Sequence, residues 1–186
     1  MPLAKEKDQR FTHADYVTWP ENERWELIDG RPYDMTPAPS TRHQMVLGNF
    51  FRILSAALEG APCKCFVAPT DVVLSEYDVV QPDVLVVCDR AKITDANIQG
   101  APDLVIEVAS PATGLKDKRE KKNLYEKHGV REYILVDPGL RCVERFFLGA
   151  DGLYGKGDVF GATERIQLLC LTEVSIDLQE VFDGPL

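Results

Sequence analysis

Two acidic residues stand where a soluble protein seldom places an unpaired charge. Glu107 lies inside the apolar run 104–109, and Asp83 opens the apolar run that ends at Cys88. A buried carboxylate without a partner is strongly destabilising, so a charge in such a strand needs a counter-charge or a metal ion. If the two strands are neighbours, both carboxylates reach one edge of a sheet, where a divalent cation such as Mg²⁺ would neutralise them. Two interpretations remain open from these residues: a metal site, or a buried salt bridge for Glu107 and an exposed acid for Asp83.

A basic helix follows Glu107. In the expected helix 113–128, Asp117, Lys121 and Tyr125 are four residues apart and share one face. The segment 116–122 contains five basic and two acidic residues, a net charge of +3, and could contact phosphate. The alternative is a solvated helix in which Asp117 and Lys121 form an ordinary surface ion pair.

The elements that must position these residues follow from periodicity and turn residues. The chain of 186 residues suits one domain with a single core. The turn Asp29-Gly30 predicts a β-hairpin, in which Pro32 favours an edge strand. The strand–strand–helix–strand order between 83 and 136 predicts an α/β protein with a mixed sheet and a crossover helix. The other expected elements are a helix at 12–19, a helix ending at Gly60, strands at 65–68, 71–74 and 132–136, and a late hairpin about Asp151-Gly152.

Composition limits the class of protein. The polar segment 1–10 lacks the apolar stretch of a signal peptide, and no apolar run approaches the roughly 20 residues that cross a bilayer. We therefore expect a flexible segment at 1–10, a single domain at 11–186, a cytoplasmic location and no membrane contact. The five cysteines are an odd number without a paired framework, which favours free, mostly buried thiols. Cys63-Lys64-Cys65 lacks the spacing of a zinc site.

The net charge of −9 argues against a protein that coats nucleic acid by electrostatics alone. It does not exclude a nuclease, because clustered carboxylates await a divalent metal and a local basic patch can hold phosphate.

Together these segments resemble one family along almost the whole chain, from Phe11 to Phe182. The matching motifs are WELIDG at 25–30, RHQ at 42–44, VQPD at 80–83, APDLVIEVASP at 101–111, DKREK at 117–121, Tyr125, GVREY at 129–133 and VDP at 136–138. The chain is similar in these segments to the Uma-two family of restriction-endonuclease-like proteins. The resemblance implies a restriction-endonuclease-like core, in which helices flank a mixed β-sheet.

The resemblance also implies a divergent PD-(D/E)XK site. Pro82-Asp83 would supply the first acid and Glu107 the second. The lysine expected two residues after Glu107 is replaced by Ala109. The family is thought to have moved this lysine to the next helix, which points to Lys121, with Lys118 as the alternative one turn away. Glu26 matches the N-terminal acid of such sites and would join the catalytic residues as an accessory metal or water ligand. Its alternative is a solvent-facing glutamate on a hairpin.

The implied activity is Mg²⁺- or Mn²⁺-dependent endonucleolytic hydrolysis of DNA. Asp83, Glu107 and the Val108 carbonyl would bind the metal, and Lys121 would position or activate water. Substrate-binding candidates are Lys118, Arg119 and Gln81, and a homodimer would suit the cutting of both strands. The alternative is the same fold retained as a nucleic-acid-binding or protein-binding module with little or no catalysis, favoured by the displaced lysine and the acidic net charge.

Overall fold

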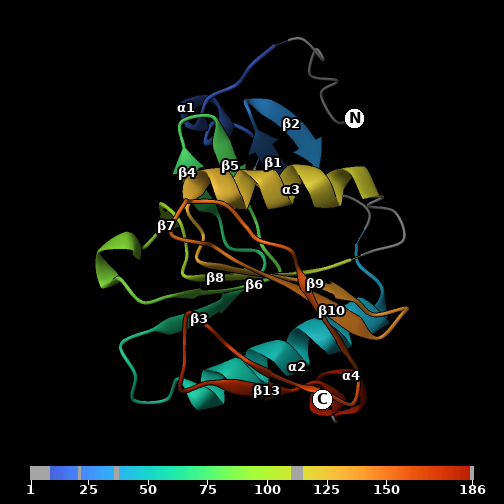
Figure 1. Ribbon diagram of the computed structural model, residues 1–186. Coiled ribbons are helices and arrows are strands. Elements are labelled where there is room, and N and C mark those ends of the chain that lie inside the picture. The colour runs from blue at the N-terminus through green and yellow to red at the C-terminus, as the bar shows by residue number, and fades with distance from the viewer. Residues whose placement is uncertain (1–8, 21, 36–37, 110–114, 185–186) are drawn as a thin grey trace.

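A six-stranded mixed sheet lies at the centre of the computed structural model (Figure 1). The structure describes residues 9–20, 22–35, 38–109 and 115–184, with side chains throughout except at 115–119. The strand order is β11-β10-β9-β8-β6-β3, and only the β8–β9 pair is parallel. The strands are β3 (Lys64–Val67), β6 (Val84–Val87), β8 (Leu104–Val108), β9 (Glu132–Asp137), β10 (Cys142–Phe147) and β11 (Asp158–Gly161).

Apart from Glu107 in β8 and the terminal residues Glu132 and Asp137 of β9, the central strands β6, β8 and β9 are largely apolar, because helices cover both faces of the sheet. Helix α2 (Thr41–Ala57) packs against the side chains of Val84 and Ile106, and α3 (Leu115–His128) packs against those of Leu85 and Val105. Figure 1 shows the two helices on opposite sides of the sheet. Since side chains alternate along a strand, Glu107 falls in the row that faces α3.

Helix α3 is the crossover between the parallel strands β8 and β9. The predicted α/β class, mixed sheet and crossover helix are therefore confirmed, as are the predicted strands at the positions of β3, β6, β8, β9 and β4 (Val72–Ser75). Helix α2 also ends before Gly60 as predicted.

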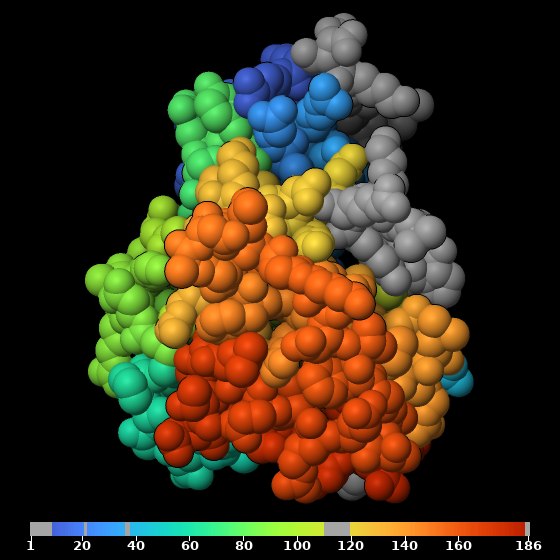
Figure 2. Space-filling view, in the orientation of Figure 1, coloured from blue at the N-terminus to red at the C-terminus, as the bar shows by residue number. Residues whose placement is uncertain are grey.

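A smaller five-stranded sheet lies on the far side of α3, in the order β2-β1-β5-β4-β7. In Figure 2 it forms a narrow lobe, coloured blue and green, above a wider body. The hairpin turn is formed by Asp29 and Gly30, both with positive φ (52° and 73°), and β2 is the edge strand predicted from Pro32. The strands are β1 (Trp25–Ile28), β2 (Arg31–Asp34), β4 (Val72–Ser75), β5 (Asp78–Val80) and β7 (Ile98–Gln99).

The remaining elements are short. Helix α1 covers only His13–Tyr16, one turn of the predicted 12–19, although the expected capping box between Thr12 and Asp15 is present. The predicted late hairpin is formed by β10 and β11. The others are η1 (Arg90–Lys92), β12 (Arg165–Gln167), β13 (Ser175–Asp177) and α4 (Leu178–Asp183). Within the described residues, no helix combines the length and apolarity that a membrane span needs. Residues 1–8 of the predicted flexible segment lie outside the described residues, and Arg10 forms an ion pair with Asp29.

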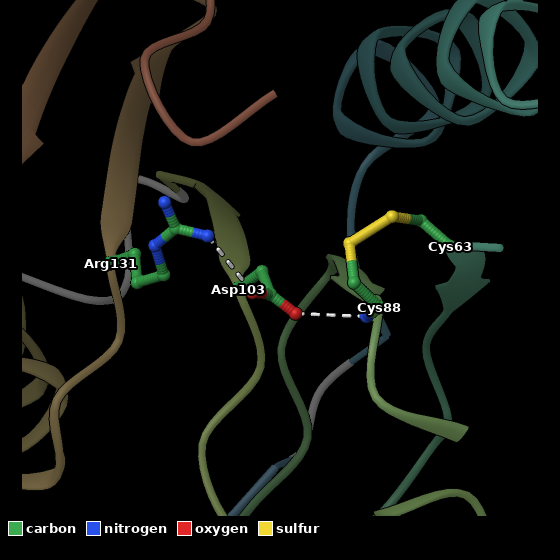
Figure 3. The surroundings of a disulfide bond; sticks show 4 residues. All are labelled: Cys63, Cys88, Asp103 and Arg131. Carbon is green, nitrogen blue, oxygen red and sulfur yellow. Dashed lines mark hydrogen bonds and ion pairs between the residues drawn. A yellow bond between two sulfur atoms is a disulfide. The ribbon is translucent and has the colours of Figure 1, made fainter. Parts of the chain in front are cut away.

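A disulfide joins Cys63 and Cys88, so the prediction of free thiols is wrong for these two residues (Figure 3). The reason is strand register: Lys64 pairs with Val87 where β3 meets β6, which places the flanking cysteines side by side. A separation of 25 residues along the sequence gives no hint of this pairing. The Cys88 amide also donates to Asp103, which approaches Arg131, as Figure 3 shows. Cys65, Cys142 and Cys170 are not in a disulfide.

Candidate active site

Asp83 and Glu107 come from adjacent strands. The antiparallel register pairs Val84 with Ile106, so Asp83 lies opposite Glu107 just beyond the end of the β6–β8 ladder. The Asp83 Oδ2 atom accepts a hydrogen bond from the Val108 backbone amide at 2.8 Å. The two carboxylates therefore converge at one edge of the sheet, as the sequence predicted, and each is largely buried.

Lys121 approaches the same edge from α3. Its Nζ atom lies 2.9 Å from Glu107 Oε1 and 2.9 Å from Glu26 Oε1. One helical turn further on, Tyr125 donates its hydroxyl to Glu107 Oε1 at 2.6 Å. The spacing of four residues thus brings a cation and a phenol onto one carboxylate.

Glu26 is contributed by the smaller sheet. It lies on β1 and is only 2% exposed, so the alternative of a solvent-facing glutamate is wrong. Its Oε1 atom accepts the Lys121 ammonium and the backbone amide of Gln81. Glu26 therefore ties the smaller sheet and α3 to the edge that carries Asp83 and Glu107.

His43 also reaches this site, although sequence analysis assigned it no chemical role. It lies in the first turn of α2, and its Nε2 atom is 3.2 Å from Asp83 Oδ2. Burial tends to lower the pKa of His43, but Asp83 and the Val108 backbone raise it above its ordinary value. The Nδ1 atom is buried and has no hydrogen-bond partner among the described residues. The available signal was its spacing: Val46 and Leu47, three and four residues on, share its buried helix face.

The four ionisable groups Glu26, Asp83, Glu107 and Lys121 carry an excess of negative charge. Burial raises the pKa of Glu107 to about 7, opposed by Lys121 and reinforced by Asp83 and Glu26. Burial would lower the pKa of Lys121, but Glu107 and Glu26 hold it well above its ordinary value, so Lys121 is an ammonium at neutral pH. With the carboxyls ionised, three negative charges face one positive charge, a balance that one divalent cation would neutralise.

The donor atoms suit Mg²⁺ or Mn²⁺ better than a metal that needs a full cage of side chains. No group of three or more His, Cys, Asp or Glu residues forms a metal cluster in the described part of the chain. Mg²⁺ commonly takes only one or two carboxylates, with water and substrate phosphate completing its shell. Asp83 and Glu107 each accept their hydrogen bonds through a single oxygen, which leaves Asp83 Oδ1 and Glu107 Oε2 without a bond to described residues. These two oxygens can accept a cation.

The remaining predicted residues divide into two groups. Gln81 lies beside the site, but its side chain is occupied within the protein: it accepts from Arg24 and donates to Asp71. Its backbone amide holds Glu26. Lys118 and Arg119 lie in α3, and their side chains are outside the described residues, which also leaves Lys118 untested as the alternative lysine.

Comparison with known proteins identifies relatives over most of the chain. The profile of the Uma2 family, described as "Putative restriction endonuclease", matches residues 13–179. An uncharacterized protein of Synechocystis sp. is 26% identical over 147 residues, which are 77% of this chain and 77% of that protein.

A solved structure has the same fold. It is the crystal structure of a protein from Anabaena variabilis described as "a putative nuclease belonging to DUF820". The TM-score is 0.78 at 18% identity, and the match covers 94% of this chain and 98% of that one.

Proposed function

The chain belongs to the Uma2 family of restriction-endonuclease-like proteins, and we propose that it is a metal-dependent endonuclease that hydrolyses phosphodiester bonds of DNA. One observation carries the proposal: the Lys121 ammonium bonds Glu107 at the sheet edge where Asp83 meets Val108. Acid, acid and lysine are the residue types of a PD-(D/E)XK site.

The proposed metal ligands are Asp83, Glu107 and the Val108 carbonyl. A bound Mg²⁺ or Mn²⁺ would polarise the scissile phosphate and lower the pKa of a water molecule. Support comes from Asp83 Oδ1 and Glu107 Oε2, which bond no described residue, and from the Val108 amide, whose hydrogen bond to Asp83 turns the end of β8 toward that carboxylate.

Lys121 is proposed as the lysine of the site. The residue two positions after Glu107 is Ala109, whose methyl group can neither donate a proton nor carry charge. Lys121 reaches Glu107 from α3 instead, at 2.9 Å. Because its pKa is raised, it is a hydrogen-bond donor that would orient water and stabilise charge on the phosphate, rather than a base. Glu26, which bonds Lys121 and the backbone amide of Gln81, would act as a positioning residue.

The test is plasmid cleavage. Supercoiled DNA is incubated with purified protein and Mg²⁺ or Mn²⁺, beside single-stranded DNA and RNA substrates. We expect nicking by the wild type, and losses of at least about 100-fold for Asp83→Asn, Glu107→Gln and Lys121→Met. Glu59→Gln is the control, because Glu59 is exposed and follows the C-terminal end of α2, at the opposite end of that helix from His43. Equal activity in all these proteins would indicate a contaminating nuclease, and activity that survives only in Lys121→Met would remove that residue from the mechanism.

The binding-module alternative predicts a different result. Retained DNA binding with no cleavage of any substrate, and no effect of metal on stability, would mean that the fold serves in binding only.

A homodimer would allow both strands of a duplex to be cut. Sedimentation or light scattering with and without duplex DNA measures this, and a monomer under both conditions would limit the enzyme to one strand per encounter.

A further inference from the structure

An open hollow of about 370 Å³ lies at the start of α2, the helix that carries His43. Its walls come from three elements that are distant in sequence. Arg42 and Met45 belong to the start of α2, Pro138 and Arg141 to the turn between β9 and β10, and Phe182 to α4. This volume lies within the range of about 300–1,000 Å³ typical of small-ligand sites.

The hollow is adjacent to the candidate catalytic residues along the chain. Arg42 directly precedes His43, whose imidazole contacts Asp83. Pro138 follows β9 two residues after Val136, which pairs with Val108. A strand whose phosphate lies at Asp83 and Val108 would therefore place a neighbouring nucleotide near the hollow.

The walls combine cationic and apolar groups. Arg42 makes no ion pair with a described residue, and the first turn of α2 contains no acid. Arg141 is held in place: its Nη1 atom lies 2.8 Å from Asp183 Oδ1, and its guanidinium lies 5.7 Å from the Phe182 ring centre. Met45 is 40% exposed beside them. The guanidinium of Arg42, which has no ion-pair partner within the described part of the chain, thus shares the hollow with a flat wall formed by the Phe182 ring and the Arg141 guanidinium.

We propose that this hollow binds one unpaired nucleotide of a nucleic-acid strand, next to the phosphodiester bond that is cut. Arg42 takes its phosphate, and the base lies against Phe182, Arg141 and Met45. Phosphate favours a guanidinium partner, and aromatic rings and Arg planes are the surfaces on which unstacked bases lie. The inference rests on the proposed nuclease function and adds its substrate class, because a base inside a continuous duplex cannot enter the hollow.

The test is equilibrium binding without catalysis. A fluorescein-labelled single-stranded oligodeoxynucleotide, and the same strand annealed to its complement, are titrated with full-length protein in EDTA and followed by fluorescence anisotropy. We expect Arg42→Ala to weaken single-strand binding about tenfold and to reduce the slope of log Kd against log salt by about 0.7, the loss of one phosphate contact. Arg52→Ala is the matched control, since Arg52 lies on the same helix, outside the hollow, and pairs with Glu180.

A second variant tests the base. Met45→Glu places a negative charge at an exposed wall position without disturbing the core, and should weaken the single strand at least about tenfold and the duplex much less. Binding like the wild type by both Arg42→Ala and Met45→Glu would overturn the proposal, as would equal losses on the single strand and the duplex, or no single-strand binding by the wild type. The proposed nuclease function is judged separately. Single-strand binding that depends on Arg42 and Met45, without cleavage of any substrate, refutes catalysis alone. Cleavage by the wild type, with strand binding that does not depend on Arg42 or Met45, refutes the nucleotide site alone.

Discussion

At the scale of single residues, Lys121 controls the electrostatics of the site. Its ammonium contacts both Glu26 and Glu107 at 2.9 Å, and removing one partner of a buried ion pair costs about 3–5 kcal/mol. We expect Lys121→Met to lower the free energy of unfolding by about 3 kcal/mol, since protonation of Glu107 offsets part of the loss. Urea denaturation in EDTA, followed by circular dichroism, measures the change.

Lys122→Met is the control for Lys121. This neighbour on α3 lies 4.1 Å from the Phe146 ring centre, an interaction worth about 1 kcal/mol or less at a partly exposed position. Equal losses of unfolding free energy in the two variants would show that Glu26 and Glu107 do not need the Lys121 ammonium as a counter-charge.

His43 is expected to orient a metal ligand. It contacts Asp83 Oδ2, and partners of this kind alter metal affinity by about 10–100-fold. A metal that binds only the folded protein raises its melting temperature, so the Mg²⁺ or Mn²⁺ concentration at half-maximal increase reports affinity. We expect His43→Asn to need about 10–100 times more metal than the wild type, and Asp83→Asn to show no increase.

His13→Asn is the control for that titration, because His13 lies on α1, away from Asp83. If metal raised the melting temperature of Asp83→Asn as much as that of the wild type, Asp83 would not be a metal ligand.

The residues of the site could be predicted where a charge conflicts with its local pattern. Glu107 was recognisable because it interrupts an otherwise apolar strand, and Asp83 because it directly precedes a second apolar strand. Glu26 and Lys121 required the family resemblance, because a glutamate in a hairpin and a lysine in a charged helix are ordinary. His43 was not assigned, since one histidine on the buried face of a helix has the same pattern as a core residue.

At the scale of elements, long apolar runs and turn residues predicted most of the fold. The strands β8 and β9, the crossover helix α3 and the hairpin at Asp29-Gly30 follow from local sequence. The strands β5 (Asp78–Val80) and β7 (Ile98–Gln99) were missed because they are very short and exist only through pairing with β1 and β4. Such pairing depends on tertiary structure, which periodicity does not encode.

Asp78 joins the smaller sheet to the end of α3, and this junction should be sensitive to acid. The residue is 1% exposed, and its Oδ2 atom contacts His128 at 2.8 Å and Lys127 at 3.1 Å. Burial favours the protonated form, but His128, the Asp29 amide and Lys127 together hold the pKa of Asp78 below its ordinary value. A lowered pKa in the folded state means that the stabilisation is complete above the unfolded pKa of about 4 and disappears as the pH falls further.

We therefore expect Asp78→Asn to lose about 2–3 kcal/mol at pH 7, and the variant and wild type to converge as the pH falls below about 4. Urea unfolding at a series of pH values from neutral to strongly acidic measures both quantities. Asp95→Asn, an exposed acid, should follow the wild type throughout. A difference that stayed constant across this range would assign the loss to packing rather than to charge.

At the scale of the whole molecule, the net charge of −9 and the proposed DNA substrate are compatible because the contacts are local. Glu26, Asp83 and Glu107 carry part of the negative charge, which repels phosphate. A divalent cation bound among them would turn this repulsion into attraction. Cations that face the substrate, such as Arg42, then need only to act over one or two phosphates. We infer that affinity depends on a few local contacts, to which a bound metal adds, rather than on a broad basic surface.

The disulfide connects the chain across β3 and β6, at the opposite end of β6 from Asp83. Closing a loop of 25 residues stabilises a folded protein by about 3 kcal/mol, so Cys63→Ser with Cys88→Ser should lower the free energy of unfolding by about that amount while leaving metal binding unchanged. Cys142→Ser is the control. Thiol titration of unfolded, unreduced protein should find Cys65, Cys142 and Cys170 only, and all five cysteines after reduction. Five reactive thiols before reduction would show that Cys63 and Cys88 are reduced. The double variant would then lose only the stability that replacing two cysteine side chains by serine costs.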